Sequence, residues 1–73
     1  MKAPRISADK LIKLIKKLGF RLARQSGSHM LFKNDAGKRI TVPYHSKKTL
    51  HPKLVSQIMK DIDISTEKMK ELL

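Results

Sequence analysis

Residues 24–29 read Arg-Gln-Ser-Gly-Ser-His, in which a turn-forming Ser-Gly-Ser lies between two short β-like runs. Gly27 adopts positive φ angles at little cost, and Ser26 and Ser28 can hydrogen-bond nearby amides, so a tight turn has a physical cause here. The imidazole of His29 then lies at the mouth of a β-hairpin. The sequence therefore predicts a hairpin that carries a proton-transfer group at its turn.

Three segments around this turn alternate between apolar and polar residues, as strands do, and they are residues 20–25, 29–33 and 38–42. The Asn-Asp-Ala-Gly sequence at 34–37 is typical of a hairpin turn, and Pro43 ends the third strand because it cannot donate to the ladder. His29 has the opposite parity to Met30 and Phe32. If those two residues face the helices, His29 faces away from them, although Leu31 shares its parity.

Helical periodicity appears on both sides of the strands. Residues 7–18 carry apolar residues at i, i+3, i+4 and i+7, with Ser7 as the expected N-cap and Gly19 as the stop. A second helix is expected from Pro52, and a short third helix is expected after Ser65 as its N-cap. The predicted fold is α+β, a small three-stranded antiparallel sheet in the order α-β-β-β-α-α. Its helices cover one face, and residues 1–73 form a single domain.

Charge points to the class of partner. The 73 residues include 17 Lys and Arg against 6 Asp and Glu, which gives a formal net charge of +11. Such an excess favours a polyanionic partner through its long-range field, and we rank nucleic acid above a merely solvated basic surface. No apolar run approaches the length of a membrane span, so we expect a cytoplasmic protein with no membrane contact.

Several kinds of chemistry are disfavoured by composition. The chain has no cysteine, so a disulfide framework, a thiolate nucleophile and a zinc ribbon are all excluded. So small a core leaves no room for a bound nucleotide or flavin, and we expect no cofactor. The six acidic residues are dispersed, so a nuclease site built on a hard metal cation is disfavoured and no metal ligands are assigned.

Without a metal ion, RNA can still be cleaved by its own 2′-hydroxyl group, given a general base, a general acid and cations for the phosphorane. Histidine suits this role because this residue type titrates near neutral pH. From spacing alone His29 is equally consistent with catalysis and with a structural strand residue. His45 is a candidate second acid-base group or phosphate contact, although its spacing better fits a solvated loop histidine. His51 precedes Pro52 and better fits a cap of the second helix.

Several other side chains are candidates for contact with RNA. Tyr44 is expected either to stack on an unpaired base or to pack in the fold. The remaining candidates are polar or basic residues expected around the open sheet face and the loop after it, namely Arg24, Ser28, Lys33, Arg39, Lys47 and Lys48.

These motifs together resemble the HicA family of mRNA interferase toxins of toxin-antitoxin systems. The resemblance covers nearly the whole chain. It rests on Lys-Leu-Gly-Phe at 17–20, Gly-Ser-His at 27–29, Thr-Val-Pro-Tyr-His at 41–45, and Leu50 with Pro52. It implies a fold similar to the double-stranded-RNA-binding domain, a catalytic role for His29, mRNA as substrate and a HicB-type antitoxin that covers the active site. The free toxin is then expected to be monomeric.

Two other functions remain open from the residues. A non-catalytic RNA-binding module of the same fold would grip duplex backbone by shape. A DNA-binding module is the weaker alternative, because no basic recognition helix with base-reading Asn, Gln or Arg side chains stands out.

Overall fold

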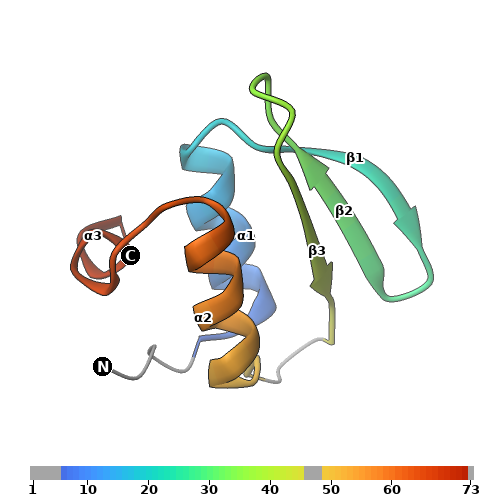
Figure 1. The fold of residues 1–73 in the computed structure, drawn as a ribbon. Helices are drawn as coiled ribbons and strands as arrows, with labels where there is room; N and C mark the ends of the chain where they lie inside the picture. Colours follow the sequence, from blue (N-terminus) through green and yellow to red (C-terminus); the bar gives the residue numbers. More distant parts are fainter. Residues whose placement is uncertain (1–5, 46–48, 73) are drawn as a thin grey trace.

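The structure is a computed structural model that describes residues 6–45 and 49–72. Its elements follow the order α-β-β-β-α-α, as Figure 1 shows. They are α1 (Ala8–Lys17), β1 (Arg21–Ser26), β2 (His29–Lys33), β3 (Arg39–Pro43), α2 (Pro52–Asp61) and α3 (Thr66–Leu72). The α+β class and the element order predicted from the sequence are confirmed.

The three strands form one antiparallel sheet in the order β1-β2-β3. β1 and β3 each begin and end one residue later than the sequence predicts. Phe20 is buried and belongs to the end of α1, since its N–H donates to the carbonyl oxygen of Ile15 at 3.0 Å. Pro43 is the last residue of β3 instead of the residue after it, which is tolerated because β3 lies at an edge of the sheet.

Helix α1 begins and ends at the residues that the sequence indicates. The hydroxyl oxygen of Ser7 accepts a hydrogen bond from the N–H of Lys10 at 3.2 Å, and this caps the N-terminus. Gly19 has a φ of 95°, and its N–H donates to the carbonyl oxygen of Lys16. With the bond from Phe20 to Ile15, this forms a Schellman motif closed by two buried side chains.

Helices α2 and α3 are joined by a second motif of this kind. The N–H of Ile64 donates to the carbonyl oxygen of Met59 at 2.9 Å, and the N–H of Asp63 donates to that of Lys60 at 3.2 Å. Asp63 has a φ of 55° where glycine is usual. The hydroxyl oxygen of Ser65 then accepts from the N–H of Lys68 at 3.1 Å, so Ser65 caps α3 as expected.

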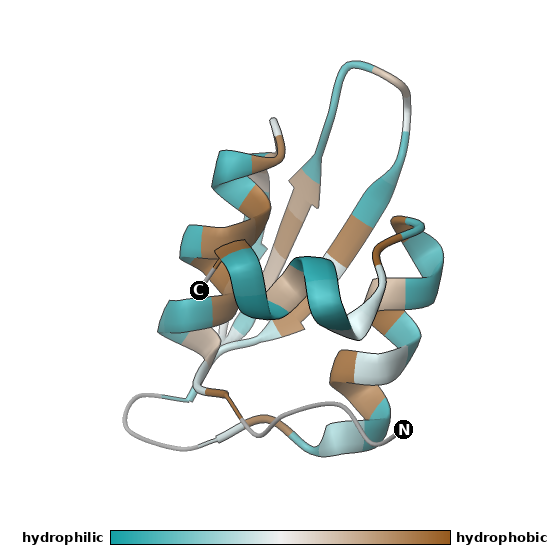
Figure 2. Ribbon diagram, turned by 90° about the vertical axis from the view of Figure 1, so that its left-hand side faces the viewer, coloured by the Kyte–Doolittle hydropathy of each residue, from teal (hydrophilic) through white to brown (hydrophobic). Residues whose placement is uncertain are grey.

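The core lies between the helices and one face of the sheet (Figure 1). The sheet contributes Phe32, Ile40 and Val42 to this core. Each of the three helices contributes as well, through residues that include Ile15, Val55 and Met69. Hydrophobic and hydrophilic residues alternate along both helices and strands, as expected for a two-layer fold (Figure 2).

The helical layer does not extend to β1. All six residues of this strand are exposed, and even Leu22, which shares a face with Phe32, is 44% exposed. The β1–β2 hairpin therefore projects beyond the helices (Figure 1). None of the helices within the described residues has the length and apolar character that a membrane crossing requires.

Candidate functional site

A two-residue turn fixes the position of His29. β1 ends at Ser26 and β2 begins at His29, and these two residues pair across the strands. Gly27 has a φ of 58°, whereas Ser28 is not among the residues with positive φ, which is the pattern of a type II′ turn. The side-chain amide of Gln25 donates to the carbonyl oxygen of Gly27 at 3.2 Å. His29 is thus the first residue of β2, and its side chain is exposed.

The strand register places His29 on the face of the sheet opposite the core. Residues paired across neighbouring strands have side chains on the same face. Three such rows cross this open face, and from the turn end inward they are Ser26–His29–Pro43, Arg24–Leu31–Thr41 and Arg21–Lys33–Arg39. The predicted orientation of His29, away from Met30 and Phe32, is confirmed, and Arg24, Lys33 and Arg39 share its face.

A β-bulge brings Arg24 to this face. Leu22 pairs with Phe32, but Arg24 pairs with Leu31, so Ala23 is an extra residue in β1. Plain alternation from Leu22 would have turned Arg24 toward the core face. The bulge reverses that parity and sets the guanidinium of Arg24 in the row next to His29.

Arg21 is a residue of this face that sequence reasoning did not assign. It pairs with Lys33, which in turn pairs with Arg39, so three cations lie side by side across the sheet. Nη2 of Arg21 donates to Oδ1 of Asp35 at 2.9 Å, with both side chains well exposed. The three strands that the structure describes contain no acidic residue, and this absence was the available signal for a basic face.

Ser28, Tyr44 and His45 gather at the same end of the sheet as His29. The N–H of Tyr44 donates to the carbonyl oxygen of Ser28 at 2.6 Å, which extends the β2–β3 pairing by one step. The ring of Tyr44 is half-buried and packs against the core, as in the packing alternative. His45 is the next residue and is exposed. Lys47 and Lys48, the other basic candidates, lie outside the described residues.

His51 acts as the N-cap of α2. Its Nδ1 accepts a hydrogen bond from the N–H of Lys53 at 3.1 Å, and Pro52 follows at the first helical position. The cap role predicted for His51 is confirmed.

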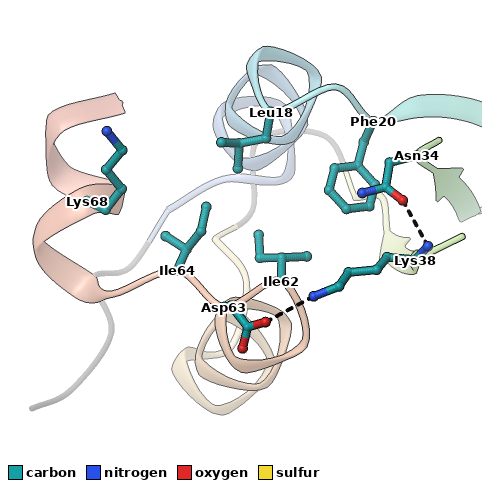
Figure 3. A pocket seen from close by; sticks show the side chains of 8 residues that line it. All are labelled: Leu18, Phe20, Asn34, Lys38, Ile62, Asp63, Ile64 and Lys68. Atoms are coloured by element: carbon teal, nitrogen blue, oxygen red, sulfur yellow. Dashed lines mark hydrogen bonds and ion pairs between the residues drawn. The ribbon is translucent and has the colours of Figure 1, made fainter. Parts of the chain in front are cut away.

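A pocket of about 350 Å³ lies at the other end of the sheet, where the β2–β3 turn meets the end of α2 (Figure 3). Its lining is half apolar and half polar or charged, and it comprises Leu18, Phe20, Ile62, Ile64, Asn34, Lys38, Asp63 and Lys68. Nζ of Lys38 donates to Oδ2 of Asp63 at 3.1 Å across it. None of its lining residues is a histidine, and it lies at the opposite end of β2 from His29. We therefore interpret this pocket as space left between packed elements and not as a reaction site.

The acidic residues that the structure describes do not converge. No group of three or more His, Cys, Asp or Glu side chains within residues 6–45 and 49–72 is placed to hold a metal ion.

The open face combines one exposed imidazole, that of His29, with four cations, Arg21, Arg24, Lys33 and Arg39. Such a surface fits a polyanion.

Comparison with known protein families decides the family. The model of the HicA toxin of bacterial toxin-antitoxin systems matches residues 8–64, from the start of α1 to the residue before the α3 cap. The chain belongs to the HicA toxin family. The match spans every strand and the two longer helices, so the HicA assignment covers the whole open face. A HicA toxin has an antitoxin partner. No curated protein gave a significant match to the chain.

Proposed function

We propose that this HicA toxin is a metal-independent endoribonuclease that cleaves mRNA with His29 as a general acid or base. The observation that carries the proposal is the exposed His29 at the turn end of a face bearing four cations and no strand carboxylate. Imidazole can accept and donate a proton near neutral pH, and the cations can stabilise charge on a phosphorane.

The reaction proceeds by attack of the 2′-oxygen on the adjacent phosphorus. A base takes the proton of the 2′-hydroxyl, the bond from phosphorus to the 5′-oxygen breaks, and an acid protonates that 5′-oxygen. The products are a 2′,3′-cyclic phosphate and a 5′-hydroxyl. Arg24 lies in the row next to His29 and is assigned to the scissile phosphate, while His45 is the candidate for the second proton transfer.

The remaining candidate residues of the open face and its turns are assigned to RNA binding. Ser28, Lys33 and Arg39 would contact phosphate or sugar, and base stacking by Tyr44 remains a prediction for whatever ring surface the core leaves uncovered. Lys47 and Lys48 belong to the same proposal on sequence grounds. A HicB-type antitoxin would cover the open face and neutralise its cations with acidic side chains.

The test compares single variants in an RNA cleavage assay with purified, antitoxin-free protein. His29→Ala should remain folded, lose cleavage by about 10²-fold or more, and no longer inhibit growth when expressed. His45→Ala tests the second proton transfer, and a loss of only a few-fold would reduce His45 to a positioning role. His51→Ala is the matched control, because it removes a histidine that caps a helix and should retain cleavage.

The chemistry is tested on the products. Cleavage should survive EDTA, leave a 2′,3′-cyclic phosphate and a 5′-hydroxyl, and spare DNA of the same sequence. An RNA with a 2′-O-methyl group at the scissile nucleotide should bind but stay intact. Products with a 5′-phosphate, or activity restored by Mg²⁺ after EDTA, would contradict the mechanism. Binding without any cleavage would support the non-catalytic RNA-binding module instead.

A further inference from the structure

We infer that the row Arg21–Lys33–Arg39 is a second phosphate subsite, which binds a phosphate other than the scissile one and is partly occupied by Asp35 when no RNA is present. This inference rests on the proposed function for the position of the scissile phosphate. The row itself follows from the strand register.

The spacing along β2 separates the two positions. Lys33 lies four residues after His29 on the same face, which corresponds to about 13 Å at ~3.3 Å per residue. Side chains that stand roughly perpendicular to the sheet at these two positions meet different phosphate groups. A strand of RNA that places its scissile phosphate at His29 and runs along β2 therefore brings a different phosphate, a few nucleotides away, to the three cations.

The composition of the row points to an anion. Its members lie on adjacent strands about 4.8 Å apart, and like charges directly opposite one another destabilise a sheet. All three side chains are exposed, so their donors are accessible to a ligand. A phosphate bridging two or three of them would relieve the repulsion, and two of the three are arginines, which bind phosphate through two parallel hydrogen bonds.

Asp35 already shows how an anion engages this row. It reaches Arg21 from the β2–β3 turn, with 2.9 Å between Oδ1 and Nη2. The side chains are 72% and 87% exposed for Arg21 and Asp35, so the pair is solvated and easily exchanged. A phosphodiester carries the same single charge as this carboxylate, but it can bridge Arg21 to Lys33 and Arg39, whereas Asp35 pairs with Arg21. RNA can therefore displace Asp35, which then acts as a weak competitor.

Binding assays test the row without depending on cleavage. The probe is a single-stranded RNA that carries 2′-O-methyl groups throughout. The variant Arg21→Gln/Lys33→Gln should bind about tenfold more weakly at 0.1 M salt. Its log-log salt slope should be smaller in magnitude by about 0.7, because one phosphate contact is lost. The control Lys60→Gln/Lys70→Gln removes the same charge from exposed positions of α2 and α3, and should change affinity by less than about twofold.

Asp35→Asn gives a test of opposite sign. Removing the competing carboxylate should tighten RNA binding about two- to fivefold. Glu67→Gln, which makes the same charge change on α3, should have a smaller effect. Equal effects of Asp35→Asn and Glu67→Gln would contradict the competition, because they would reflect net charge alone.

The position of the second phosphate is found with neutral methylphosphonate linkages. One linkage, a few nucleotides from the mapped cleavage site, should weaken binding to the wild type and have no further effect on Arg21→Gln/Lys33→Gln. If no linkage shows this coupling, or if the control pair weakens binding as much as the row variant, the second subsite does not exist. Absence of cleavage by wild-type protein would instead overturn the proposed function and leave these binding results standing.

Discussion

At the scale of single residues, the conformation of Gly27 determines where His29 can act. The two-residue turn ends β1 and starts β2, so any shift in this turn would change the register that sets His29 on the open face. A Cβ atom at Gly27 would meet nothing within 4 Å, so the requirement for glycine is purely conformational, from its φ of 58°.

Substitution of Gly27 separates conformation from packing. Gly27→Ala should lower the free energy of unfolding by about 1–2 kcal/mol, because an L-residue is strained at positive φ. The chain is short enough for chemical synthesis, and D-alanine at position 27 should match or exceed the wild-type stability. Urea denaturation measures the free energy of unfolding of both variants. Equal losses with L- and D-alanine would show that the turn conformation is not the cause.

The orientation of His29 could be predicted from the sequence, but that of Arg24 could not. Parity along a regular strand relates His29 to Met30 and Phe32, whose apolar character marks the core face. The bulge at Ala23 interrupts this rule in β1, and alanine carries no turn or glycine signal that would reveal it. Arg21 was not assigned because its importance depends on its neighbours Lys33 and Arg39 in other strands.

At the scale of secondary-structure elements, local signals predict helix ends well because caps involve neighbouring residues. Ser7, Gly19 and Ser65 take the roles expected of them, and each makes its hydrogen bonds within one turn of the helix. The exception is Asp63. This residue lies two positions after the end of α2, and aspartate gives no clear sign of a left-handed conformation.

Substitutions at Asp63 test the strain at the end of α2. Asp63→Gly should raise the free energy of unfolding by about 0.5–1 kcal/mol, because glycine adopts positive φ without strain. The ion pair lost with Lys38 is solvated and contributes little. Asp63→Ala should instead lower the free energy by about 1 kcal/mol, since alanine tolerates the left-handed conformation less well than aspartate does. Urea titrations that gave the same value for Gly and Ala would rule out strain at this residue.

At the scale of the whole molecule, the contacts that join distant segments are the ones that sequence reasoning could not supply. Nζ of Lys17 donates to the carbonyl oxygen of Leu72 at 3.0 Å, and Nζ of Lys38 donates to the carbonyl oxygen of Asp61, the last residue of α2, at 3.2 Å. Long basic side chains have many partners available, and only the packed fold selects among them. Charge, in contrast, is a sum over the sequence, and its excess correctly indicated a basic molecular surface.

The net charge of +11 predicts how RNA affinity depends on salt. Four to six phosphate contacts, at ~0.7 each on a single strand, correspond to a log-log slope of about −3 to −4. Fluorescence anisotropy across a range of salt concentrations measures this slope on uncleavable RNA. An affinity that stays constant with salt would remove the electrostatic basis for binding to the open face.

The exposed strand β1 also has a consequence for the lifetime of the site. No helix within residues 6–45 and 49–72 covers this strand, so its hydrogen bonds to β2 can open locally at lower cost than global unfolding. Its amide protons should therefore exchange with solvent faster than those of the central strand. Each such opening dismantles the rows that contain Ser26, Arg24 and Arg21. Any ligand or antitoxin that spans the open face would therefore hold β1 against β2. Its binding would slow amide exchange in β1 and leave exchange in the helices unchanged.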